Sequence, residues 1–202
     1  MTKNLRFRVL GDSLAAGVGC ARPDQTLGHL LTATLRADGH DVRLGVHAVP
    51  GARSTELAAQ VRAAVAGGVD LALVVIGAND LASFTPPAVG ARLLQDAVTD
   101  LRGAGAQVVV VTAPDLGVVA HVPPVFRDLV SQASQAYARA QADSAVHAGA
   151  TVAHVDDQVL ARFTTDAGLF SADRFHPSPA GYALIATTIG PYLRTAADTR
   201  AA

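Results

Sequence analysis

Short apolar runs alternate with longer amphipathic stretches along almost the whole chain. Five of the runs have the length and composition of β-strands, and they cover residues 7–10, 42–49, 71–76, 107–112 and 151–155. The stretches between and after them repeat apolar residues at helical spacing and predict helices over residues 26–37, 54–66, 87–103, 126–148 and 178–194. Ser54 is expected to cap the second of these helices, and Ser178 followed by Pro179 marks the start of the last.

This alternation predicts an α/β fold, with a parallel sheet of about five strands covered by helices on both faces. The run Leu71–Ile76 is apolar on both of its faces, as expected of a central parallel strand. No repeat, low-complexity tract or linker divides the sequence, and 202 residues suit a single domain over residues 1–202. Ligands of such sheets bind at the carboxyl ends of the strands, so we look for chemistry there.

Composition argues against several classes of protein. Half of the residues are hydrophobic, 16% are charged and the net charge is −1, with no basic cluster of the kind that binds nucleic acid. Cys20 is the single cysteine, so no intrachain disulfide can form, and we interpret it as a small, partly buried residue. No apolar run has the length of a leader peptide or a membrane span. We expect a cytoplasmic protein without membrane or nucleic-acid partners.

A candidate nucleophile follows the first predicted strand. Gly11-Asp12-Ser13-Leu14 places a serine at a turn on the edge of the sheet, where a substrate could reach it. A serine hydroxyl is a weak nucleophile until a base takes its proton. Taken alone, Ser13 could equally be a turn or helix-cap residue.

A candidate base and its partner lie near the other end of the chain. Asp173 precedes His176 by three residues, just before the last helix. On a turn, this spacing lets the carboxylate accept a hydrogen bond from Nδ1 and leaves Nε2 free to face a serine. Taken alone, Asp173 could cap a turn and His176 could be a surface histidine.

Acyl transfer also needs hydrogen-bond donors for the negative charge that develops on the carbonyl oxygen. Asn79 follows the third strand and carries a side-chain NH₂ group, and Gly51 follows the second strand and lets its backbone N–H approach a substrate. The N–H of Ser13 is a third candidate. The simpler alternatives are an ordinary turn at Gly51 and an Asx-turn at Asn79.

Four blocks of the chain together resemble the SGNH, or GDSL-type, hydrolases. They are Gly11-Asp12-Ser13-Leu14, Gly51, Gly77-Ala78-Asn79-Asp80 and Asp173-Arg174-Phe175-His176-Pro177, which look like blocks I, II, III and V of that family in the right order. The resemblance implies a flavodoxin-like, three-layer α/β/α sandwich and no metal or organic cofactor. It also implies that Ser13 is the nucleophile, His176 the general base and Asp173 its orienting partner, with Ser13, Gly51 and Asn79 forming the oxyanion hole.

The second block departs from the family pattern, because no asparagine precedes Gly51 between residues 46 and 50. Arg53 lies near this position, and it either meets an anionic group of the substrate or is a solvated residue at a helix start. The apolar segment 116–125 follows the fourth strand, and we interpret it as the lining of an acyl pocket or as an ordinary packed loop. Asp12 and Asp80 are given supporting roles. The remaining histidines lack metal-ligand spacing.

The predicted function is hydrolysis of carboxylic esters or thioesters of small or medium acyl chains, through an acyl-enzyme on Ser13. An acyltransferase would use the same intermediate with an alcohol acceptor in place of water. A non-catalytic module that binds a small ligand at the sheet edge is the alternative from a different class. A classical α/β-hydrolase would need Gly-x-Ser-x-Gly, whereas Ala15 stands at the position of the last glycine.

Overall fold

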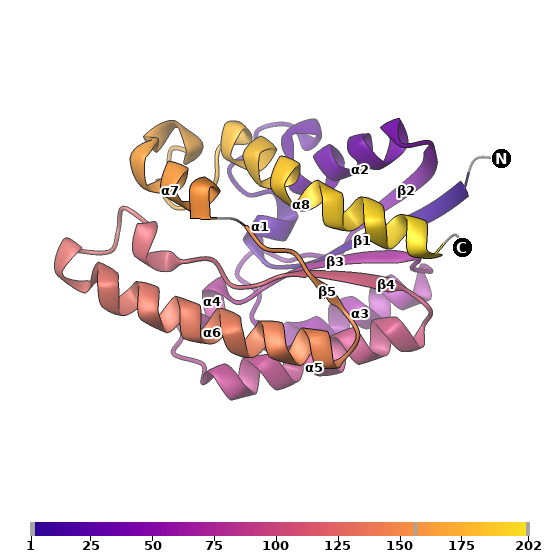
Figure 1. Ribbon diagram of the computed structural model, residues 1–202, viewed down its shortest axis with the longest axis horizontal. Helices are drawn as coiled ribbons and strands as arrows, with labels where there is room; N and C mark the ends of the chain where they lie inside the picture. Colours follow the sequence, from indigo (N-terminus) through magenta and orange to yellow (C-terminus); the bar gives the residue numbers. More distant parts are fainter. Residues whose placement is uncertain (1–2, 156, 201–202) are drawn as a thin grey trace.

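The computed structural model describes residues 3–155 and 157–200, in which five strands form one parallel sheet (Figure 1). The strands are β1 (Lys3–Gly11), β2 (His40–Val46), β3 (Leu71–Val75), β4 (Gln107–Val111) and β5 (Thr151–Val152). Their order across the sheet is β2-β1-β3-β4-β5. This is the strand order of the flavodoxin-like doubly wound fold, so the predicted fold class is confirmed.

Helices cover both faces of the sheet. The α-helices are α1 (Ser13–Ala16), α2 (Leu27–Ala37), α3 (Leu57–Ala66), α4 (Ala78–Ala82), α5 (Pro87–Gly103), α6 (Arg127–His147), α7 (Asp157–Thr165) and α8 (Pro179–Arg200). Figure 1 shows α2 and α8 above the sheet and α3, α5 and α6 below it. Alternate residues of each strand point to opposite faces, so Val9 packs with α2 and α8 while Leu10 packs with α3.

The register of the strands explains why the loops that follow them meet on one edge. Gly11 in β1 is the register partner of Val75 in β3, and Val75 is the partner of Val111 in β4. The three strands therefore end level with one another. Every residue of β3 is buried, as expected of a strand covered on both faces. The chain after each of these strands leaves the sheet at the same edge.

Several element boundaries differ from the prediction. Ser54 does not cap an α-helix, because residues Ser54–Glu56 form the 3-10 helix η2 and α3 begins at Leu57. The fifth strand is limited to Thr151–Val152, and the last helix continues to Arg200, through Pro191, beyond the predicted end at residue 194. The short helices α1 and α4 lay inside segments interpreted as turns, and α7 lay in a segment without a prediction.

The start of α8 agrees with its sequence signals. Ser178 Oγ accepts a hydrogen bond from the N–H of Gly181 at 3.3 Å, and Pro179 is the first helical residue. None of the helices in the described part of the chain combines the length and the apolar character needed to cross a membrane.

Candidate active site

Ser13 is the first residue of α1, which begins directly after β1. Gly11, with φ of 133°, makes the turn between them, and a Cβ atom there would lie 1.8 Å from the carbonyl oxygen of Val75. Only glycine therefore fits this position. The side chain of Asp12 caps α1 by accepting a hydrogen bond from Leu14 N–H at 3.0 Å. Ser13 is held at the carboxyl edge of the sheet as a result, and it is 6% exposed.

A tight loop before α8 carries Asp173 and His176. The loop is closed by an antiparallel bridge between Phe170 and Pro177, and Arg174 adopts a left-handed backbone conformation with φ of 54°. Asp173 Oδ1 accepts hydrogen bonds from the backbone N–H groups of Phe175 and His176, at 2.8 and 2.9 Å. These bonds fix the carboxylate beside the imidazole.

The two ends of the chain meet at this loop. His176 Nε2 lies 2.9 Å from Ser13 Oγ, and His176 Nδ1 lies 2.6 Å from Asp173 Oδ2. The structure thus brings together the three residues that the sequence singled out, although 163 positions separate Ser13 from His176. The ring of Phe175 packs edge-on against the imidazole, with ring centroids 4.9 Å apart.

The environment of Asp173 favours its ionised form. Partial burial by itself would raise the pKa of this carboxyl group. The hydrogen bonds from the His176 ring, from the backbone N–H groups of Phe175 and His176 and from the Ser171 hydroxyl outweigh burial and hold the pKa well below its usual range. An ionised carboxylate only accepts hydrogen bonds, so His176 Nδ1 is the donor to Asp173, and in the neutral imidazole Nε2 can then accept one from Ser13.

Gly51 lies in the turn after β2, and Asn79 lies in the short helix α4 on the same edge of the sheet. Val49 to Ala52 form a turn, closed by a 3.0 Å bond from Ala52 N–H to Val49 O, with Pro50 and Gly51 at its centre. Gly51 has a φ of 84°, as a type II turn requires at its third residue. Asn79 Nδ2 donates to Ala52 O at 3.0 Å, which joins α4 to this turn. Within residues 3–155 and 157–200, the N–H of Gly51 donates no hydrogen bond.

Two buried carboxylates support these segments. Asp80 accepts hydrogen bonds from the backbone N–H and the hydroxyl of Ser54, at 3.0 and 3.1 Å, and so ties the start of α4 to η2. Ser54 therefore binds Asp80 and does not cap an α-helix as predicted. Asp12 is 1% exposed, and burial raises its pKa to about 6, with a further increase from the charge of Asp80.

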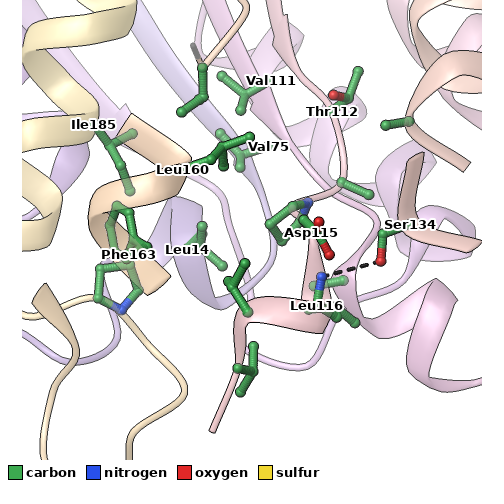
Figure 2. Close-up of a pocket in the computed structure, with 18 of the residues that line it drawn as sticks. Leu14, Val75, Val111, Thr112, Asp115, Leu116, Ser134, Leu160, Phe163 and Ile185 are labelled. Atoms are coloured by element: carbon green, nitrogen blue, oxygen red, sulfur yellow. Dashed lines mark hydrogen bonds between the residues drawn. The ribbon is translucent and has the colours of Figure 1, made fainter. Parts of the chain in front are cut away.

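A cavity of about 240 Å³ lies between α6, α7 and α8 (Figure 2), and its lining includes Leu14, the residue after Ser13, and Phe175 and Pro177, which flank His176. Leu14, Phe163 and Ile185 form one wall, and Asp115 and Leu116 lie on the opposite wall. Its lining is mostly apolar, and its polar members include Asp115, Ser134 and His154. The segment interpreted as an acyl-pocket lining contributes Leu116, Val118 and Val119.

The remaining sequence candidates lie outside this cluster of contacts. Arg53 is exposed and precedes η2. Cys20 is partly buried and donates a weak hydrogen bond to Gln25 O at 3.3 Å. Among the side chains that the structure describes, no group of three or more histidine, cysteine, aspartate or glutamate residues could hold a metal ion.

Sequence reasoning missed two buried glutamines at this edge. Gln60 on α3 bonds to Gly11, and Gln141 on α6 bonds to Ile76 and Ala113. The burial of Gln60 could have been predicted from the sequence, because Gln60 lies on the same face of α3 as Leu57, Val61 and Ala64. A polar residue on an apolar stripe is buried and needs hydrogen-bond partners.

Comparison with known proteins places this geometry in a family. Residues 9–184 match the GDSL-like lipase/acylhydrolase family. The GDSL-like esterase Rv1075c of Mycobacterium tuberculosis is 36% identical over 197 residues, which are 96% of this chain. The chain spans 63% of the length of that relative.

Solved structures share the fold. The crystal structure of TesA superposes with a TM-score of 0.78 at 22% identity, covering 94% of this chain and 98% of the other. The acetylxylan esterase Axe2 of Geobacillus stearothermophilus superposes with a TM-score of 0.69 at 17% identity, covering 93% of each chain. The sequence match extends over all four blocks of residues at the candidate site, and the chain belongs to the GDSL-like lipase/acylhydrolase family.

Proposed function

We propose that this chain hydrolyses carboxylic esters or thioesters through a covalent acyl-enzyme on Ser13. The observation that carries the proposal is the chain of contacts from Ser13 Oγ to His176 Nε2, at 2.9 Å, and from His176 Nδ1 to Asp173 Oδ2, at 2.6 Å. Nucleophile, base and orienting group are within hydrogen-bond reach of one another, as this chemistry requires. Membership of the family supports the same conclusion.

In the proposed reaction, Ser13 Oγ attacks the carbonyl carbon while its proton passes to His176 Nε2. The tetrahedral intermediate collapses, the bond to the leaving oxygen or sulfur breaks, and the imidazolium returns the proton to the leaving group. A water molecule then attacks the acyl-enzyme, again with His176 as base, and releases the acid and the free serine. Asp173 stays ionised throughout and stabilises the imidazolium.

The oxyanion is assigned to the N–H groups of Ser13 and Gly51 and to the Asn79 amide. Ser13 is the first residue of α1, so its N–H has no partner within the helix. One hydrogen of the Asn79 amide is bound to Ala52 O, and the second is available to a ligand. The turn at Gly51 leaves that N–H available as well.

We assign the cavity beside Leu14 to the acyl chain of the substrate. The cavity is lined by the residue after Ser13 and by both neighbours of His176, is mostly apolar and has a volume of about 240 Å³. Burial of apolar surface contributes about 0.8 kcal/mol for each CH₂ group, so longer chains gain binding energy there until the cavity is full. An acetyl group would leave most of the volume empty. We therefore expect medium acyl chains to be preferred over acetyl groups. The structural neighbour Axe2, by contrast, is named as an acetylxylan esterase.

The test is hydrolysis of a series of p-nitrophenyl esters from acetate to decanoate, with the matched thioesters, by the wild-type protein and by Ser13→Ala. Wild-type kcat/KM should rise from acetate to a medium chain, and Ser13→Ala should lose about 10⁴-fold or more in kcat. Equal hydrolysis by Ser13→Ala would overturn the proposed nucleophile. A maximum at acetate would overturn the acyl-pocket assignment and leave the nucleophile standing.

A further inference from the structure

Two fully enclosed glutamine side chains bind the backbone at the carboxyl edge of the sheet, next to the proposed oxyanion donors. Gln60 is 5% exposed and Gln141 is 0% exposed. Burying a primary amide is costly unless its donors and acceptor are all bonded. Each amide oxygen accepts one hydrogen bond from a backbone N–H, and each Nε2 donates one to a backbone carbonyl.

Gln60 holds the peptide groups of Gly11. Its Oε1 accepts from Gly11 N–H at 2.7 Å and its Nε2 donates to Gly11 O at 2.9 Å. The same Gly11 O accepts a hydrogen bond from Val49 N–H at 3.1 Å. Gly11 precedes Ser13 by two residues and Val49 precedes Gly51 by two, so one side chain fixes the approach to two of the proposed donors.

Gln141 spans the gap between β3 and β4 just beyond their last register pair. Its Oε1 accepts from Ala113 N–H at 2.7 Å, and its Nε2 donates to Ile76 O at 3.0 Å. Gly77 and the helix α4, which carries Asn79, follow directly after Ile76. A Cβ atom on Gly77 would lie 3.0 Å from Gln141 Nε2 and 2.7 Å from the Ala113 side chain. Glycine at position 77 therefore makes room for this amide.

We propose that Gln60 and Gln141 are positioning residues for the oxyanion hole, an inference that rests on the proposed function. Neither touches the reacting atoms. Each bonds to backbone groups at the carboxyl ends of the strands, where the pairing between neighbouring strands ends, and so sets the relative positions of α1 with Ser13, the turn with Gly51 and α4 with Asn79. A displacement of about 1 Å in such a frame can cost about 10²-fold in rate.

The first test replaces each glutamine by methionine, which has a similar shape and no amide. We expect Gln60→Met and Gln141→Met to lower kcat by about 10- to 100-fold and to leave KM within about 2-fold, because the donors matter most in the transition state. Inhibition by a trifluoromethyl ketone, which forms a tetrahedral adduct, should weaken by the same factor as kcat. Gln132→Met on the exposed face of α6 is the control and should match wild type.

The second test is Gln141→Glu, and it keeps the inference testable if a methionine variant fails to fold. A protonated glutamic acid can donate to Ile76 O and accept from Ala113 N–H, whereas a carboxylate would face Ile76 O with no proton. Burial raises the pKa of a glutamic acid, so the variant should approach wild-type kcat at acidic pH and lose kcat relative to wild type as pH rises. Wild-type kcat and inhibitor binding in all these folded variants, or a kcat ratio for Gln141→Glu that is constant with pH, would overturn the inference. If the wild-type protein hydrolysed none of the esters and thioesters, the proposed function itself would be overturned.

Discussion

The two sides of the site beside Ser13 are built in opposite ways. On the side of α3 and α4, buried amide and carboxylate groups bond to the backbone, as Gln60 does with Gly11 and Asp80 with Ser54. Between α6, α7 and α8 lies a mostly apolar cavity of about 240 Å³. Directional hydrogen bonds fix geometry, and apolar contacts tolerate changes of shape. The polar side should therefore determine the rate for all substrates, and the cavity should determine which acyl chain is preferred.

Among changes to polar groups that do not line the cavity, Asp173→Asn should have the largest effect. Asparagine keeps an oxygen for the N–H groups of Phe175 and His176, but its NH₂ group would face Nδ1 and favour the wrong tautomer of the imidazole. We expect kcat to fall by about 10⁴-fold for every ester in the series. Asp166→Asn, which changes the exposed cap of the 3-10 helix η5 (Ala167–Leu169), is the matched control. A fall confined to long-chain esters would contradict the division between the two sides.

Asn79→Ala should come next. Removal of one oxyanion donor costs about 10² to 10³ in kcat, and KM should change little. The same factor is expected for acetate and octanoate esters, because the donor contacts the carbonyl oxygen and not the acyl chain. Asn4→Ala, an exposed residue in β1, provides the control. A large rise in KM at unchanged kcat would show that Asn79 binds the ground state instead.

Replacement of Val118 and Val119 by serine tests the cavity side. The hydroxyl groups make the wall polar, so we expect kcat/KM for octanoate relative to acetate to fall about 10-fold, with kcat on acetate retained. Val146→Ser, at an exposed position of α6, should leave the ratio unchanged. An unchanged ratio in the double variant would show that the acyl chain does not reach this wall.

Asp12→Asn should have the smallest effect on turnover and a clear effect on stability. Burial raises the pKa of Asp12 to about 6, above its unfolded value of about 3.9. The folded state therefore holds this proton more tightly, so the contribution of Asp12 to stability is present below pH 4 and is lost as pH rises through 6.

Asparagine keeps the cap on Leu14 without the charge, so the free energy of unfolding of Asp12→Asn relative to wild type should increase between pH 4 and pH 7. Urea denaturation at several pH values measures this difference. Asp96→Asn, at an exposed helix position, is the control. A difference that does not vary with pH would mean that Asp12 does not titrate in this range.

The sequence predicted the arrangement of the strands and the residues at their ends, and it did so for a physical reason. Parallel strands buried on both faces, such as Leu71–Val75, are continuous apolar runs, and their carboxyl ends share one edge. Ser13 and His176 could therefore be paired across the length of the chain. The bond between Ser54 and Asp80 was missed, because local spacing made Ser54 look like a helix cap.

The glutamines were missed for a related reason. Gln141 shares a buried face of α6 with Ser134, Tyr137 and Ala145, so this face has no continuous apolar stripe from which burial could be inferred. Its partners, Ile76 and Ala113, lie on two different strands, and only the three-dimensional structure shows that these strands separate there. The cavity likewise depends on α7, a helix that no strand-and-helix alternation predicted.

Reaction with a fluorophosphonate probe, followed by mass-spectrometric mapping of the adduct, tests most directly whether the contact between Ser13 and His176 activates the serine. The account predicts one adduct, on Ser13, formed by the wild-type protein and lost in His176→Ala. An intact folded protein that gives no adduct, or an adduct on another residue, would contradict it.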